Sequence, residues 1–209
     1  MRDTAYLDSI IDRILPICQV ARPTDNYHLE PGRLRGGTRD WVYTCMNWIG
    51  VPRDTIPYEH IFIHSGLSVP AKIELSTEFS REYPEGHSAL SLYISHELHI
   101  SLKGVAALIA HECTHLYLIE QGRQALKGES TIMGMEDEFE TEVASIILGL
   151  GKVVLNGVCD YAEKKPGRRI GYLSAVEFGY VYTQTGVRLG LIQSVLQQGL
   201  IPSAIEVLQ

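Results

Sequence analysis

The sequence lacks most features of secreted, membrane-spanning or nucleic-acid-binding proteins. Its 4 cysteines lie far apart and form no CxxC pair, which argues against a cysteine zinc knuckle and gives no disulfide framework. The longest apolar run, 143–155, is too short to span a bilayer and is interrupted by Lys152. No lysine and arginine block resembles a phosphate-binding surface, and the formal net charge is −7. We therefore expect a cytoplasmic protein with neither a nucleic-acid nor a membrane partner.

The beginning of the chain also lacks the pattern of a secretory signal. Three aspartates interrupt residues 1–17, where a signal would have a positive start and an unbroken apolar middle. The apolar residues instead recur at three- and four-residue intervals, which predicts an amphipathic helix over 4–15 that ends at Pro16. With 209 residues, 45% of them hydrophobic, the chain has the size and composition of one folded domain.

Alternating polarity and β-branched residues predict a small sheet in the first half of the chain. The candidate strands are residues 59–66, 69–76 and 88–98. In the third of these, small and polar residues alternate with leucine and isoleucine, which is the strongest strand pattern in the sequence. Before the strands, a short helix is expected over 38–49, with Thr38 as its cap.

Two long helices are expected after the strands. Ser101 is a capping residue, and the apolar residues that follow it form one helical stripe from Leu102 onward. The second helix is expected to begin near Glu136 and to run to about Leu155. These patterns predict an α+β fold that is predominantly helical, with a small mixed sheet packed on the first long helix.

The whole chain, residues 1–209, is interpreted as a single domain, because no linker or internal repeat divides it. Its expected parts are an N-terminal helix and loop (about 1–50), the strands (about 59–98), the two long helices (about 101–157) and a C-terminal helical part (158–209).

The first long helix contains polar residues in an apolar context, within 105-VAALIAHECTHLYLIE-120. Burying such groups without partners is costly, so they need something to bind. His111 and His115 are four residues apart, so they project from one helix face and can offer ring nitrogens to a single tetrahedral ion. Glu112 lies beside them. In this His-Glu-x-x-His arrangement one Zn²⁺ activates a water molecule, and the glutamate accepts its proton as general base.

A second set of carboxylates lies in 137-DEFETE-142, where Glu138 and Glu142 share a helix face. Over about residues 101–157 the chain resembles the gluzincin metallopeptidases, and short minigluzincin-like and bacterial zincin-like proteins. This resemblance implies that Glu138 is the third zinc ligand and that Glu142 holds a zinc histidine from behind. Asp137 and Glu142 depart from the family pattern, which has Asn and Asp there, so Glu142 as the ligand stays an alternative.

The gluzincin resemblance further implies a donor that stabilises the oxyanion, commonly a histidine or a tyrosine. No histidine follows His115, which leaves the tyrosines at positions 161, 172, 180 and 182. We favour Tyr180 or Tyr182, within 177-EFGYVY-182, for this catalytic role. The alternative is that both tyrosines pack in a helix interface.

Together these patterns predict zinc-dependent hydrolysis of a peptide or protein substrate, with an edge strand at 88–96 pairing with the substrate backbone. One alternative is a zinc-binding interaction or regulatory module without peptidase activity, in which the same residues join two helices. Three evident ligands favour catalysis, because structural zinc sites normally have four. A third interpretation treats the motif as accidental and the protein as a helical interaction module. The sequence does not indicate an oligomeric state.

Overall fold

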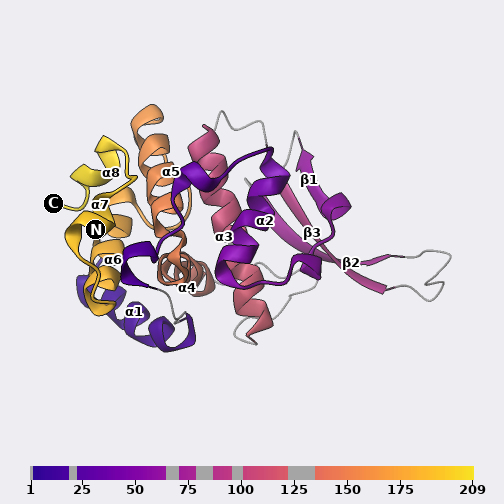
Figure 1. Ribbon diagram of the computed structural model, residues 1–209, viewed down its shortest axis with the longest axis horizontal. Coiled ribbons are helices and arrows are strands. Elements are labelled where there is room, and N and C mark those ends of the chain that lie inside the picture. The colour runs from indigo at the N-terminus through magenta and orange to yellow at the C-terminus, as the bar shows by residue number, and fades with distance from the viewer. Residues whose placement is uncertain (1, 19–22, 65–70, 79–86, 96–100, 122–134) are drawn as a thin grey trace.

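The computed structural model describes residues 2–18, 23–64, 71–78, 87–95, 101–121 and 135–209 (Figure 1). Within these ranges the chain is predominantly helical and contains one small sheet, which confirms the expected α+β class. The helices are α1 (Thr4–Cys18), α2 (Thr38–Ile49), α3 (Leu102–Glu120), α4 (Met135–Ser145), α5 (Gly151–Lys164), α6 (Ala175–Arg188), α7 (Gln193–Gln197) and α8 (Pro202–Glu206).

The sheet is mixed, as expected, and its three strands have the order β1-β3-β2. β1 (Ile61–His64) runs parallel to β3 (His87–Ser95), and β2 (Ala71–Glu78) runs antiparallel to it. The expectation that the strand at 88–96 forms an edge is wrong, because β3 is hydrogen-bonded on both sides and the edges are β1 and β2. The outer residues of the predicted strands, at 65–66, 69–70 and 96–98, lie outside the described residues.

α3 is the central element of the molecule. It packs against α2, α4 and α5 and against the sheet strands β2 and β3, and Figure 1 shows it between the sheet and the group of helices that contains α1 and α4 to α8. Its first turn begins as predicted, because the Ser101 hydroxyl accepts the N–H of Gly104 at 3.2 Å. Most of its side chains are therefore buried, and exposed polar ones such as Lys103 and Glu120 lie near its two ends.

Two predicted helix ends differ from the structure. α1 continues past Pro16 to Cys18, so the proline lies inside the last turn and does not end the helix before it. α2 begins at Thr38 as its first helical residue, so its cap is Gly37, whose N–H donates to the Asp40 carboxylate at 2.8 Å.

The predicted helix from 136 to 155 is in fact two helices. α4 ends at Ser145, a wide turn follows over Ile146–Leu150, and α5 begins at Gly151. Gly149 has a φ of 83° at this break, a conformation that glycine adopts without strain. The break frees backbone carbonyls, and these are satisfied from the segment before α2: the Leu29 N–H donates to the Gly149 carbonyl at 2.7 Å.

One helical stretch, Glu138–Lys164, is long and apolar enough to cross a membrane when the break is ignored. The whole of its apolar window is buried inside the molecule. The core helices of globular proteins have the same composition, so this stretch is weak evidence for a membrane span.

Candidate metal centre

The structure brings together the two histidines of α3 and a glutamate of α4. The His111 Nε2 atom lies 3.0 Å from the Glu138 Oε2 atom and 3.0 Å from the His115 Nε2 atom. The His115 Nε2 atom lies 3.3 Å from the same Glu138 oxygen. The histidines meet because they are four residues apart on one helix, and Glu138 joins them because α4 packs against α3.

These three donor atoms fit a metal ion. Bonds of about 2.0 to 2.1 Å in a tetrahedral site place the donors about 3.3 Å apart, close to the separations found here. Two imidazoles and one carboxylate are a donor set that zinc takes in proteins. In the part of the chain that the structure describes, no other group of three such side chains converges in this way.

A threonine of α4 contacts the His115 ring at the nitrogen that does not face Glu138. The Thr141 Oγ1 atom lies 3.1 Å from the His115 Nδ1 atom, and Thr141 is fully buried. When Nε2 carries the lone pair that binds a metal, Nδ1 carries the proton and donates it to the threonine oxygen. Thr141 therefore orients the His115 ring.

Glu142 has a different position from the one that the gluzincin resemblance implies. Its Oε1 atom accepts the backbone N–H of Tyr172 and its Oε2 atom accepts that of Leu173, both at 2.7 Å. Its carboxylate thus holds a loop, and the residue that contacts the zinc-motif histidine is Thr141. The described hydrogen bonds of Glu142 go to this loop, while its charge acts on His111. Glu138 is the carboxylate that converges with the histidines.

The electrostatics of the centre favour a cation. Burial lowers the pKa of His111, but its bond to Glu138 and the charges of Glu112 and Glu142 outweigh burial and raise this pKa to about 8. Burial raises the pKa of Glu138, but its hydrogen bonds to the two histidines outweigh burial and lower this pKa to about 2. The buried centre therefore concentrates negative charge around two imidazoles, where a divalent cation is stabilised.

Glu112 lies beside the three donors without being one of them. Its side chain is buried, and burial raises the pKa of its carboxyl group against the opposing charges of His115 and His111. A carboxylate with a raised pKa beside a metal site is suited to accepting a proton. Its placement therefore fits a general base.

Neither of the favoured tyrosines reaches the centre. The Tyr180 hydroxyl donates to Asp8 of α1 at 2.7 Å, and the Tyr182 hydroxyl donates to the carbonyl of Leu196 at 2.9 Å. Tyr182 is fully buried, with its ring 4.9 Å from that of His28. The structure thus corrects their predicted catalytic role, because both hydroxyls are used in helix packing.

Tyr172 is the tyrosine that lies at the centre. Its ring is 6.5 Å from the His111 ring, with an angle of 24° between the two planes. Burial raises the pKa of Tyr172, and the negative charges of Glu138, Glu142 and Glu112 raise it further, so its phenol stays protonated. Tyr172 lies in the C-terminal part that the sequence predicted to be helical, whereas the structure places it in the loop two residues before the capping residue Ser174. No local pattern in the sequence shows that it faces α3.

Comparison with known proteins does not assign a function. No protein-family model, no curated protein and no solved structure matches the chain.

The centre places three kinds of functional group close together. Three donor atoms lie within 4.8 Å of one another, the buried Glu112 interacts electrostatically with both histidines, and the Tyr172 ring lies 6.5 Å from that of His111. A Lewis acid, a base and a hydrogen-bond donor are the groups that metal-assisted hydrolysis uses.

Proposed function

We propose that the protein is a zinc-dependent peptidase of the zincin type, in which His111, His115 and Glu138 hold one Zn²⁺. The triangle of donor atoms, with edges of 3.0, 3.0 and 3.3 Å, carries the proposal. Three protein donors in place of four is the composition of catalytic zinc sites. When bound, zinc supplies Lewis acidity, which lowers the pKa of a water molecule and polarises a substrate carbonyl group.

The protein's own residues move and stabilise charge in the reaction. Glu112 takes a proton from the attacking water and delivers it to the amine as the carbon–nitrogen bond breaks. Tyr172 donates its hydroxyl proton in a hydrogen bond to the oxygen that becomes negative in the transition state. Thr141 keeps His115 in the tautomer that leaves Nε2 free to bind the metal.

A peptide or protein is the proposed substrate, and an edge of the sheet is its proposed backbone partner. β3 is central, so this role passes to an edge strand, and β2 is an edge strand that packs on α3. An extended peptide added to that edge would run past the helix that carries the histidines. The four cysteines are buried free thiols, which suits the reducing cytoplasm that we propose as its location.

The decisive experiment compares zinc-loaded wild type with Glu112→Gln on a complex peptide mixture. Mass spectrometry should find new peptide termini made by the wild type. The variant should bind the same one equivalent of zinc and form these termini at least about 100-fold more slowly. Glu120→Gln, at the exposed end of the same helix, is the control and should behave as wild type.

Two results would contradict the proposal. New termini at an unchanged rate with Glu112→Gln would remove the general base from the mechanism. No new termini, with one equivalent of zinc confirmed in both proteins, would support the zinc-binding module without peptidase activity.

A further inference from the structure

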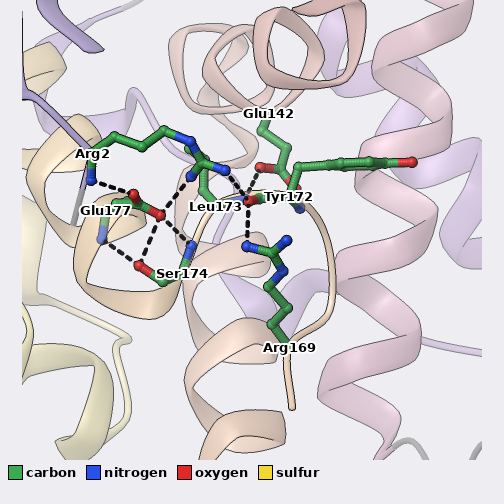
Figure 2. A network of polar contacts seen from close by, with 7 residues as sticks. All are labelled: Arg2, Glu142, Arg169, Tyr172, Leu173, Ser174 and Glu177. Carbon is green, nitrogen blue, oxygen red and sulfur yellow. Dashed lines mark hydrogen bonds and ion pairs between the residues drawn. The ribbon is translucent and has the colours of Figure 1, made fainter. Parts of the chain in front are cut away.

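The loop that carries Tyr172 is fixed to the body of the protein by its backbone (Figure 2). Glu142 accepts the N–H groups of Tyr172 and Leu173, as described above. The Tyr172 carbonyl accepts a hydrogen bond from Arg2 at 3.3 Å and another from Arg169 at 3.1 Å. Both polar groups of the Tyr172 backbone are therefore held, and Figure 2 shows the ring extending away from them toward α3.

Arg2 connects three parts of the structure. Its Nη1 atom lies 2.8 Å from the Glu177 carboxylate in the first turn of α6. Its guanidinium carbon lies 4.2 Å from the centre of the Phe139 ring, next to Glu138 on α4. Its Nη2 atom reaches the Tyr172 carbonyl. The planar fork of arginine makes these contacts at once, which a lysine cannot do.

Arg169, the other donor to the Tyr172 carbonyl, does not connect the loop to another part of the structure as Arg2 does. Arg169 belongs to the same loop, three residues before Tyr172, and it is exposed. Its bond shapes the loop but does not attach it to another element. Arg2 lies 170 residues away in sequence, so its bond joins the loop to the segment before α1.

We propose that Arg2 is a positioning residue for Tyr172. By fixing the Tyr172 carbonyl while Glu142 fixes its N–H, Arg2 keeps the phenol beside His111. The kinetic consequence rests on the proposed peptidase function, because a misplacement of about 1 Å at a reacting group costs on the order of 100-fold in rate. The placement of the loop does not depend on that function.

Hydrogen exchange at the Tyr172 and Leu173 amides measures this placement directly, because both amides donate to Glu142. In Arg2→Met, exchange at these amides should become about tenfold faster, as expected for local opening. Arg188→Met is the matched control. It removes an ion pair that also joins α6 to the start of the chain, through Asp8, without touching the loop, and exchange at the two amides should match wild type.

A second variant separates positioning from folding. Arg2→Lys keeps a positive charge for Glu177 but loses the forked contact, so it should keep the melting temperature of wild type and still show faster exchange at Tyr172 and Leu173. Unchanged exchange at these amides in both Arg2 variants would overturn the inference. The inference would also be overturned if the amides throughout α1, α4 and α6 exchanged faster by the same factor as those of Tyr172 and Leu173, because Arg2 would then only stabilise the fold.

The kinetic arm is a double-mutant cycle. Arg2→Met should lower kcat about tenfold with KM little changed, and Tyr172→Phe should lower kcat about 100-fold. In the Tyr172→Phe background, Arg2→Met should have no further effect, and independent losses would overturn the inference. If the wild type hydrolyses nothing, the proposed function fails while the exchange measurement still decides the role of Arg2.

Discussion

The carboxylate of Glu177 collects hydrogen bonds from two residues. Arg2 donates from its backbone N–H at 2.7 Å and from its side chain at 2.8 Å. Ser174 donates from its backbone N–H at 2.8 Å and from its hydroxyl at 2.9 Å. Burial acts to raise the pKa of Glu177, but these donors and the charge of Arg2 hold it at about 2, below its ordinary value of 4.5.

The stabilisation from Glu177 should therefore depend on pH. Because folding lowers the pKa of Glu177, its ionised carboxylate stabilises the folded state at pH values above the ordinary pKa of about 4.5. This stabilisation is lost as the pH falls from about 4.5 toward about 2. Glu177→Gln should cost about 1 to 2 kcal/mol at pH 7, since water screens part of the attraction. Urea unfolding should show this difference shrinking by more than half between about pH 5 and pH 3. A difference that stays constant over this range would contradict the argument.

At the residue scale, the sequence predicts what is local. His111, Glu112 and His115 follow from spacing within one helix. Glu138 was indicated by the resemblance to the gluzincins, because spacing alone leaves Glu138 and Glu142 on one helix face. The sequence does not predict the position of Tyr172, because this position depends on Glu142, 30 residues away, and on Arg2, 170 residues away. Tyr180 and Tyr182 have the same chemistry, and only the packing of α6 shows that their hydroxyls are used elsewhere.

The crossing of α3 and α5 depends on one glycine. A Cβ atom at Gly157 would lie 2.4 Å from the Lys103 carbonyl oxygen and 2.5 Å from the Ala107 Cβ. Both atoms belong to the first two turns of α3, the helix that carries the two histidines. No side chain fits there unless the two helices separate.

Gly157→Ala should destabilise the protein by about 1 to 3 kcal/mol, because the added methyl group overpacks this crossing. The sign is informative, since alanine in a helix is otherwise more favourable than glycine by about 1 kcal/mol. Gly32→Ala is the control, because no atom lies within 4 Å of its added Cβ, and its effect should stay within about 0.5 kcal/mol. Urea unfolding measures both, and a more stable Gly157→Ala would contradict the close crossing.

At the element scale, the break between α4 and α5 is the main difference from the predicted helix. The apolar pattern continues through it, and a glycine inside a helix costs only about 1 kcal/mol, so Gly149 alone does not predict a break. The break is stabilised by residues far away in sequence: Tyr27 donates to the carbonyl of Ile147, and Leu29 donates to that of Gly149. The order of the strands is likewise a long-range property, which is why β3 was expected at an edge.

At the scale of the whole molecule, metal binding and stability should be coupled. The three donors come from two helices that meet only in the folded chain, so zinc should bind the folded state alone. Zinc at 100 times its dissociation constant then adds about 2.7 kcal/mol, which corresponds to a melting temperature about 5 to 10 °C higher. Thermal unfolding with added zinc or with a chelator tests this. An unchanged melting temperature in wild type would contradict the site, and His111→Ala should abolish the shift.

The contacts of Arg2 can form only late in the synthesis of the chain, because its partners lie far along the sequence. Arg2 precedes Tyr172 by 170 residues and Glu177 by 175 residues. At about 5 to 20 residues per second, a ribosome makes these partners about 10 to 35 seconds after Arg2. Until then, the growing chain can present both histidines and Glu138 without the positioned tyrosine. The contacts of Arg2 with Tyr172 and Glu177 therefore form only after the start of α6 has left the ribosome.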